Sequence, residues 1–347
     1  MQEKLNEEQY LLKIYQMINK EHPIPKSEEE KNIAIKCVKQ KYPQILILYK
    51  QYKNNPIGVS LFELQEYVDL RKMEFFYINR NVPTGDCVDS WIGLSDLKEY
   101  MLKRLVSYRV MGKGDVNKIL SNSRILPEII NRVGLQSAKY YITTFYEQDQ
   151  GEEDEFLITP SFLEQGDELV HLKDICGSEL EIPVIEKKIQ EYLRLRHFSK
   201  EQIETLRKEF IKQVFMSKFL ANKDENNGNT SIIISQDNGM RNIKMAPMYD
   251  FDFTCGSERI HGCNIERTIG DKKDLESLAS HYKKEEWFLK WVKEKVLTLH
   301  INDIHFEKNN NKPDISKETL AQYVRFLDTQ KRRIELALEN SNTLEEI

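Results

Sequence analysis

The chain has 347 residues, more than one hydrophobic core usually organises, so two lobes or two modest domains are expected. Hydrophobic residues make up 40% of it, including 16 Tyr, 15 Phe and 3 Trp, which is enough apolar surface to exclude a disordered protein. The 51 basic and 56 acidic residues are mixed along the sequence and leave a net charge of only −5. No whole-chain field therefore attracts nucleic acid or an anionic membrane.

Membrane and disulfide signals are also missing from the sequence. No segment approaches the ~20 consecutive apolar residues that span a bilayer, and residues 1–8 lack the basic start and apolar core of a signal peptide. We therefore expect a cytoplasmic protein. The five cysteines are scattered, which is typical of reduced thiols. Cys255, His261 and Cys263 form the one cluster that zinc could use, but they lack a CxxC pair and a fourth ligand, so ordinary thiols are the preferred interpretation.

Three regions are predicted along the chain, and together they indicate an α+β fold. Residues 1–130 form a mostly helical N-terminal region in which no motif carries recognisable chemistry. Residues 131–198 are predicted to be a small β-containing lobe. Residues 199–347 are predicted to be a mostly helical lobe that holds the candidate site.

Within the first region, apolar residues recur at helical spacing over residues 11–18, 28–48, 60–67 and 94–120. Pro23 and Pro25 separate the first two of these segments. Ser95 would be the N-cap of the last one.

The second region opens with a run rich in β-branched and aromatic residues. Residues 139–146 and 156–159 flank an acidic turn and predict an antiparallel hairpin. Helical spacing follows over residues 182–198. Ser199 and Gln202 then form a capping-box signature, which predicts the start of another helix.

That helix leads into a polar loop and a second predicted hairpin. Residues 230–235 read as a buried strand, Asn-Gly at 238–239 favours a tight turn, and residues 243–250 supply the partner strand. Two amphipathic helices are predicted after it, over residues 275–299 and 316–338.

Asp224, Asn229 and Asp250 are the residues that indicate chemistry. The hairpin begins just after Asn229 and closes just before Asp250, so all three polar side chains are expected to converge at one edge. Asn, Asp and Gly in such a loop are also typical of an ordinary surface turn, but the returning acidic strand end favours a site. Asp252 is a rival to Asp250, because a two-residue strand period puts both carboxylates on one face.

Phosphoryl transfer needs a carboxylate that orients the attacking hydroxyl and oxygen ligands that hold Mg²⁺ against the phosphates. Mg²⁺ prefers carboxylate and amide oxygens, which suits Asn229 and Asp250 as metal ligands. This choice leaves Asp224 as the base or orienting group.

The sequence resembles the HipA-like kinase family, in which an Asp is followed five residues later by Asn and then by a hairpin that ends in Pro-x-Tyr-Asp. Here these motifs read Asp-Glu-Asn-Asn-Gly-Asn at 224–229 and Pro-Met-Tyr-Asp at 247–250. The resemblance covers roughly residues 130–340 and is specific over about thirty of them. The family's loop often carries a His in its middle, where this chain has Glu and Asn.

This resemblance implies a protein-kinase-like two-lobed fold that transfers the γ-phosphate of ATP to a Ser or Thr hydroxyl. Asp224 would be the catalytic base, and Asn229 and Asp250 would be the metal ligands. The expected cofactors are therefore ATP and Mg²⁺.

Residues 133–139 are similar in kind to the family's small-residue loop that covers the phosphates, where Gly and Ser permit close approach of the backbone. The candidate ATP-binding residues are Gly134, Gln136, Ser137 and Lys139. Lys173 is a distant alternative as the phosphate-binding lysine. Either Glu186 or Glu191 could pair with the lysine, and the sequence does not decide between them.

The leading hypothesis is thus a serine/threonine kinase acting on a protein substrate. A phosphoinositide-type hydroxyl is a variant acceptor, although no membrane-binding surface is evident. The family resemblance allows an antitoxin-like partner protein, while direct contact with nucleic acid is not predicted. The alternative, from a different class, is a catalytically silent kinase-like module that binds a partner protein.

Overall fold

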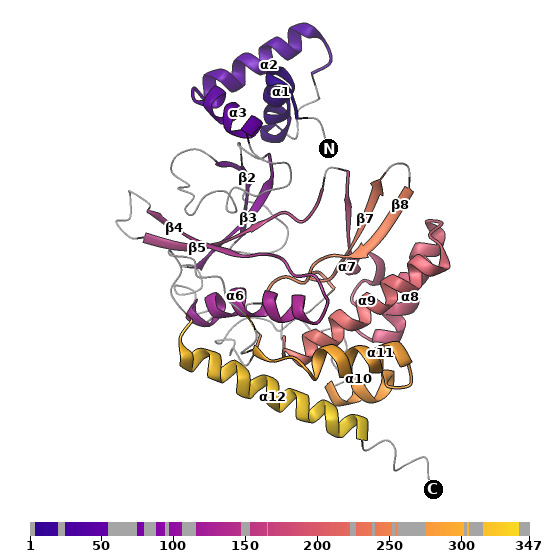
Figure 1. Ribbon diagram of the computed structural model, residues 1–347. Helices are drawn as coiled ribbons and strands as arrows, with labels where there is room; N and C mark the ends of the chain where they lie inside the picture. The colour runs from indigo at the N-terminus through magenta and orange to yellow at the C-terminus, as the bar shows by residue number, and fades with distance from the viewer. Residues whose placement is uncertain are drawn as a thin grey trace. The chain divides into compact units, whose positions relative to one another are not determined.

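The computed structural model describes residues 4–19, 25–54, 75–79, 88–93, 97–105, 116–146, 153–164, 166–222, 227–237, 240–251, 254–255, 275–301, 304 and 315–339. The chain forms two compact units, which are interleaved along the sequence rather than consecutive. The first comprises residues 1–107, 140–161 and 309–312, and the second comprises residues 108–139, 162–308 and 313–347. Each unit combines helices with an antiparallel sheet, as expected for the α+β class (Figure 1).

The first unit begins with a bundle of three helices, α1 (Glu7–Ile18), α2 (Glu28–Lys41) and α3 (Ile45–Asn54). Capping boxes start α1 at Asn6 and α2 at Ser27, so local sequence defines both helix starts. The helices enclose a shared core of Tyr10, Leu11, Ile14, Val38, Tyr42, Ile45 and Leu48. The helices predicted for the beginning of the chain are confirmed, with a break after α2.

A five-stranded antiparallel sheet completes the first unit, in the order β1-β2-β3-β5-β4. Its strands are β1 (Phe75–Asn79), β2 (Val88–Gly93), β3 (Glu99–Arg104), β4 (Tyr141–Tyr146) and β5 (Glu153–Pro160). The predicted hairpin is confirmed as β4 and β5, with Tyr141 opposite Ile158.

The helix predicted for residues 94–120 is wrong where β3 lies. Tyr100 and Leu102 are buried and alternate with the half-buried Met101 and Lys103, which is the period of a strand. Because β3 pairs with β2 on one side and β5 on the other, tertiary pairing overrides the helical spacing of the apolar residues in this part of the sequence. The predicted N-cap at Ser95 and the helix predicted for residues 60–67 lie outside the described residues.

The second unit contains a long helix, a three-stranded sheet and a set of further helices (Figure 1). Its elements are α6 (Val116–Arg132), β6 (Glu168–His171), α7 (Leu172–Cys176), α8 (Ile182–Leu195), α9 (Lys200–Phe219), β7 (Ser231–Asp237), β8 (Met240–Met245), α10 (Leu275–Tyr282), α11 (Glu286–Trp291), η2 (Val292–Val296) and α12 (Lys317–Glu339). The sheet order is β6-β7-β8, and both pairings are antiparallel. No helix of the described residues is long and apolar enough to cross a bilayer.

Most elements predicted for this unit are confirmed. The hairpin is β7 and β8, with Ile232 opposite Met245, but β8 ends at Met245 and does not reach Asp250, where the predicted strand ended. Helix α9 begins with the predicted capping box. There, the Gln202 amide nitrogen donates to Ser199 Oγ at 3.1 Å, and the Ser199 amide donates to Gln202 Oε1 at 3.0 Å. The single helix predicted over residues 275–299 is instead divided into α10, α11 and η2, with a break that places Glu285 beside α9.

A cluster of charged side chains joins four helices of this unit. Arg207 of α9 donates two hydrogen bonds to Glu285, at 3.0 and 2.6 Å, and its Nε lies 2.9 Å from Oε1 of Glu186 on α8. Tyr282 of α10 donates to Glu186 at 3.2 Å, and Trp287 of α11 donates to Glu285 at 2.5 Å. Burial raises the pKa of Glu186, whereas the hydrogen bonds from Arg207 lower the pKa of Glu285.

Replacing Arg207 by alanine should destabilise the second unit strongly, because the half-buried Glu186 would lose its counter-charge. We expect Arg207→Ala to lower the free energy of unfolding by about 3 kcal/mol. Arg194→Ala is the matched control, since the side chain of Arg194 is exposed and hydrogen-bonds within α8 to Gln190. The control should change stability by less than about 0.5 kcal/mol. Urea unfolding followed by tryptophan fluorescence measures both, and equal losses would contradict a stabilising role of the cluster.

The carboxylates of Glu186 and Glu285 should contribute to the free energy of unfolding with opposite dependence on pH. The pKa of Glu186 is raised, so its contribution is present below the unfolded value of about 4.3 and is lost as the pH rises through the folded pKa. Glu186→Gln should therefore gain stability relative to the unmodified protein between pH 4 and pH 7.

The pKa of Glu285 is lowered, so its contribution is present above about pH 4.3 and is lost as the pH falls through the folded pKa. The stability lost in Glu285→Gln should therefore shrink towards pH 3. Urea midpoints between pH 3 and pH 7 test both variants. Curves that run parallel to that of the unmodified protein would rule out this linkage.

Candidate functional site

The loop that leads into β7 is held by the start of α7. The Leu172 amide donates to the Thr230 carbonyl at 2.9 Å, and the Lys173 amide donates to the Asn227 carbonyl at 2.9 Å. Both donors belong to the first turn of α7, whose amides have no partner inside the helix. The polar loop therefore supplies acceptors that a helix start requires, and its backbone is fixed on either side of Asn229.

Asn227 anchors the same loop through its side chain. The residue is buried, and its Nδ2 donates to the carbonyls of Gly177 at 2.9 Å and Glu179 at 2.6 Å. A buried amide that makes two such bonds is costly to replace, because the carbonyls would lose their donors. Asn227 thus fixes the backbone of the loop two residues before Asn229.

The other end of the hairpin is held by α9. The Ala246 amide donates to the Ser231 carbonyl at 2.8 Å, and buried Gln213 donates to the Ala246 carbonyl at 2.8 Å. Glu209 accepts from the Met245 amide at 3.1 Å. Side chains of a helix therefore satisfy the backbone where the ladder of β7 and β8 ends.

Tyr249, on the chain that follows β8, contacts the polar loop that precedes β7. Its hydroxyl donates to the Gly228 carbonyl at 3.2 Å, and its ring stacks on Phe162 with centroids 6.0 Å apart. Gly228 precedes Asn229, and Tyr249 precedes Asp250. The structure thus brings together the immediate neighbours of two predicted metal ligands, which are both half-buried.

Asp250 adopts a left-handed backbone conformation, with φ of 62°. Such a conformation costs roughly 1–2 kcal/mol for a residue that has a Cβ, although Asp tolerates it better than most. Strain of this kind persists only where the surroundings enforce it, and it is concentrated at functional sites.

Gly134 ends α6. Its φ is 82°, its amide donates to the Asn131 carbonyl at 3.0 Å, and the Leu135 amide donates to the Ile130 carbonyl at 3.1 Å. These two bonds make a Schellman motif, in which a left-handed glycine closes the helix. The role predicted for Gly134 in ATP binding stays a prediction, and its local role is to end a helix.

The residues after Gly134 lie beside the chain that follows β8. The Met248 amide donates to the Gln136 carbonyl, and the Ala138 amide donates to the Met248 carbonyl, both at 2.9 Å, which makes a parallel bridge between Ser137 and Met248. The predicted phosphate-covering segment is therefore paired with the chain two residues before Asp250. The side chains of Gln136 and Lys139 are exposed, and Ser137 is half-buried.

Other predicted residues are placed as follows. Asp224 and the rival Asp252 lie outside the described residues, as do His261 and Cys263. Glu186 is bound to Arg207 and Tyr282, whereas Glu191 forms an exposed ion pair with Lys187 at 3.9 Å. Lys173 is exposed, and Cys255 is a buried thiol whose pKa is raised by burial to about 12. In the part of the chain that is described, no three acidic, His or Cys side chains are grouped as a metal site would need.

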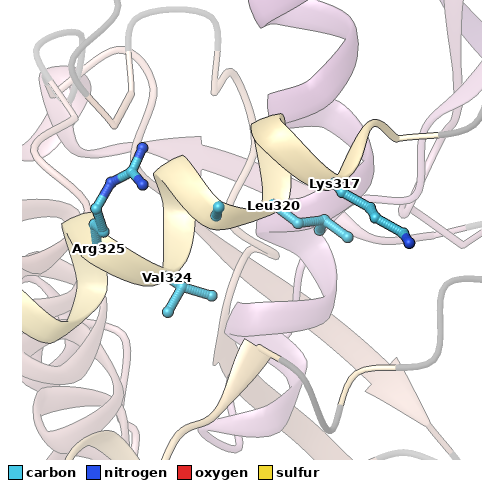
Figure 2. Close-up of a pocket in the computed structure, with 5 residues that line it drawn as sticks. Lys317, Leu320, Val324 and Arg325 are labelled. Carbon is cyan, nitrogen blue, oxygen red and sulfur yellow. The ribbon is translucent and has the colours of Figure 1, made fainter.

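A hollow of about 400 Å³ lies against α12 (Figure 2). It is lined by Lys317, Leu320, Ala321, Val324 and Arg325. These residues share one helix, and no carboxylate is among them. The part of the lining that the structure describes therefore offers Mg²⁺ no carboxylate and includes no residue of the predicted site.

Sequence reasoning missed Asn122 of α6, which hydrogen-bonds to the segment that follows Asp250. A signal was present, since Asn122 is a polar residue on the apolar stripe of α6, three residues after Ile119 and four before Leu126. A buried Asn on such a stripe indicates a specific hydrogen-bond partner elsewhere in the fold.

Replacing Gly134 should reveal its role at the end of α6. Gly134→Ala should lower the free energy of unfolding by about 1–2 kcal/mol, because a left-handed backbone is unfavourable for alanine. An added Cβ would meet no atom within 4 Å, so the loss should come from the backbone and not from a clash. Gly134→Asn should lose less, since Asn tolerates this conformation. Urea unfolding measures the three proteins, and equal stability of all three would contradict the Schellman assignment.

No protein-family model matches the sequence, and a search of the curated proteins finds no match. Among solved structures, the fold is similar to a Helicobacter pylori proinflammatory kinase, CtkA, with 14% identity and a TM-score of 0.43, over 74% of this chain and 95% of that chain. It is also similar to HipA of Shewanella oneidensis MR-1, solved in a toxin–antitoxin complex with HipB and operator DNA, with 10% identity and a TM-score of 0.36, over 77% of this chain and 62% of that chain. At these values the function has to be argued from the residues themselves.

Proposed function

We propose that this chain is an ATP- and Mg²⁺-dependent phosphotransferase with a protein-kinase-like two-lobed fold, and that it transfers the γ-phosphate to a Ser or Thr hydroxyl. The observation that carries the proposal is the hydrogen bond from Tyr249 to the Gly228 carbonyl. Asn229 directly follows Gly228, and Asp250 directly follows Tyr249. The hydrogen bond therefore supports a placement of Asn229 and Asp250 close to each other.

The donor set of Asn229 and Asp250 fits a magnesium ion. Asn229 offers an amide oxygen and Asp250 a carboxylate, and Mg²⁺ favours oxygen ligands of these kinds while it retains several waters. The left-handed backbone of Asp250 supports a functional rather than a purely structural role. When bound, the ion would neutralise charge on the phosphates.

Asp224 is proposed as the base that accepts the proton of the attacking hydroxyl. In the sequence it stands between Asn222 and Asn227, which are both buried. A catalytic base has to lie close to the acceptor hydroxyl, and the carboxylate of an Asp can accept the proton of that hydroxyl.

The nucleotide phosphates are proposed to lie along residues 136–139. The pairing of Gln136 and Ala138 with Met248 supports this placement, because it sets the segment beside the chain that leads from β8 to Asp250. Lys139 is exposed and is proposed to contact the phosphates as a point charge.

The acceptor is proposed to be a protein in the cytoplasm. An antitoxin-like partner protein also belongs to this proposal.

The competing function is a catalytically silent module that binds a partner protein. The observation that favours it is a set of exposed apolar side chains on α2 and α3, where Ile33 and Ile47 are each 62% exposed. Exposed apolar residues of this size are typical of interaction surfaces when they gather in one patch.

The test is nucleotide binding and phosphate transfer by the purified full chain with ATP and MgCl₂, with mass spectrometry to detect self-phosphorylation. Asp224→Ala should abolish transfer and retain nucleotide binding, because the base is not a phosphate ligand. Asn229→Ala and Asp250→Ala should lower transfer by at least about 100-fold, with a higher Mg²⁺ requirement.

Arg194→Ala is the control, because Arg194 is exposed and hydrogen-bonds within α8 to Gln190. It should leave transfer unchanged. A folded protein that binds no nucleotide would refute the kinase proposal and favour the silent module.

A further inference from the structure

The segment that follows Asp250 is strained at both ends. Asp250 has φ of 62° and Cys255 has φ of 55°, and each conformation costs roughly 1–2 kcal/mol for a residue that is not glycine. Phe251, Thr254 and Cys255 are buried. Contacts from the surrounding helices must therefore hold this backbone in place.

Asn122 of α6 supplies two of these contacts. The residue is fully buried, and its Nδ2 donates to the Phe251 carbonyl at 2.9 Å and to the Thr254 carbonyl at 3.3 Å. The Phe251 carbonyl belongs to the residue directly after Asp250. The Cys255 amide, beyond it, donates to the Leu220 carbonyl at the end of α9, at 2.8 Å.

The orientation of the Asn122 amide is set from α12. The Tyr323 hydroxyl donates to Asn122 Oδ1, and the ring of Tyr323 lies under Lys118 Nζ at 4.1 Å from the centroid. Because Oδ1 accepts from a hydroxyl, Nδ2 faces the two carbonyls. Tyr323 is itself buried, so this orientation is enclosed from solvent.

We infer that Asn122 is a positioning residue for Asp250 and that Tyr323 orients it. The inference rests on the proposed function, since it assigns to Asn122 the placement of a metal ligand. Met248 is tied to Gln136 and Ala138 before Asp250, and Asn122 ties Phe251 after it. Because the chain is held on both sides of Asp250, its carboxylate would meet Mg²⁺ from a single backbone conformation. Groups behind a metal ligand typically change metal affinity by 10–100-fold when they are removed.

The test is a titration of MgCl₂ against binding of a fluorescent ATP analogue to the full chain. Asn122→Ala should raise the Mg²⁺ concentration at half-maximal binding by about 10–100-fold. Tyr323→Phe should raise it less, because it removes the hydroxyl and keeps the ring. Phosphate transfer should recover towards that of the unmodified protein at saturating Mg²⁺, which a simple loss of folded protein would not allow.

Ser123→Ala is the matched control. Ser123 is buried on the same helix next to Asn122, and its hydroxyl donates to the Leu120 carbonyl within α6 at 2.9 Å. It should leave the Mg²⁺ midpoint unchanged. If Asn122→Ala does not fold, Tyr323→Phe decides, and a midpoint equal to that of Ser123→Ala overturns the inference.

Failure of the two proposals can be told apart. Mg²⁺-dependent binding that is equal in the unmodified protein and in all three variants overturns the role of Asn122 and leaves the proposed function standing. No Mg²⁺-dependent binding by the unmodified protein overturns the proposed function, and the positioning role falls with it.

Discussion

The second unit depends on how the chain leaves β8, because from Met245 to Phe251 side chains of helices take over from the sheet ladder. Gln213 and Glu209 of α9 satisfy the backbone at Ala246 and Met245, and Asn122 of α6 satisfies it after Asp250. Each contact replaces a hydrogen bond that a neighbouring strand would otherwise supply. The candidate site thus lies where backbone geometry is imposed by helices, which is how a left-handed Asp can persist.

The helices that impose this geometry are themselves joined by charge. Arg207 bonds carboxylates from two different helices, and such a buried cluster adds specificity of arrangement more reliably than it adds stability. Its position on α9 matters, since the same helix carries Gln213 and Glu209. The charge cluster that joins α9 to α8, α10 and α11 therefore lies on the same helix as the side chains that hold the end of β8.

Much of the fold was predictable because its signals are local. The capping box at Ser199 and the hairpins of β4 with β5 and of β7 with β8 are each encoded within a short stretch of sequence. Strand β3 and the interleaving of the two units depend on pairings between distant segments, and no local period encodes them. The same limit explains Asn122, whose partners lie 129 and 132 residues away along the chain.

One contact beside the candidate residues was predictable for the same reason. Two segments that flank one hairpin must approach each other, so chain connectivity accounts for the hydrogen bond between Tyr249 and Gly228, which precede Asp250 and Asn229. The glycine signal at Gly134 was ambiguous, because a left-handed residue serves a helix end as well as a phosphate loop. The structure shows the helix end and the pairing of Gln136 and Ala138 with Met248, whereas binding of phosphate by this segment belongs to the proposed function. Gly134 ends α6, and the residues that follow it pair with Met248, which lies between the end of β8 and Asp250.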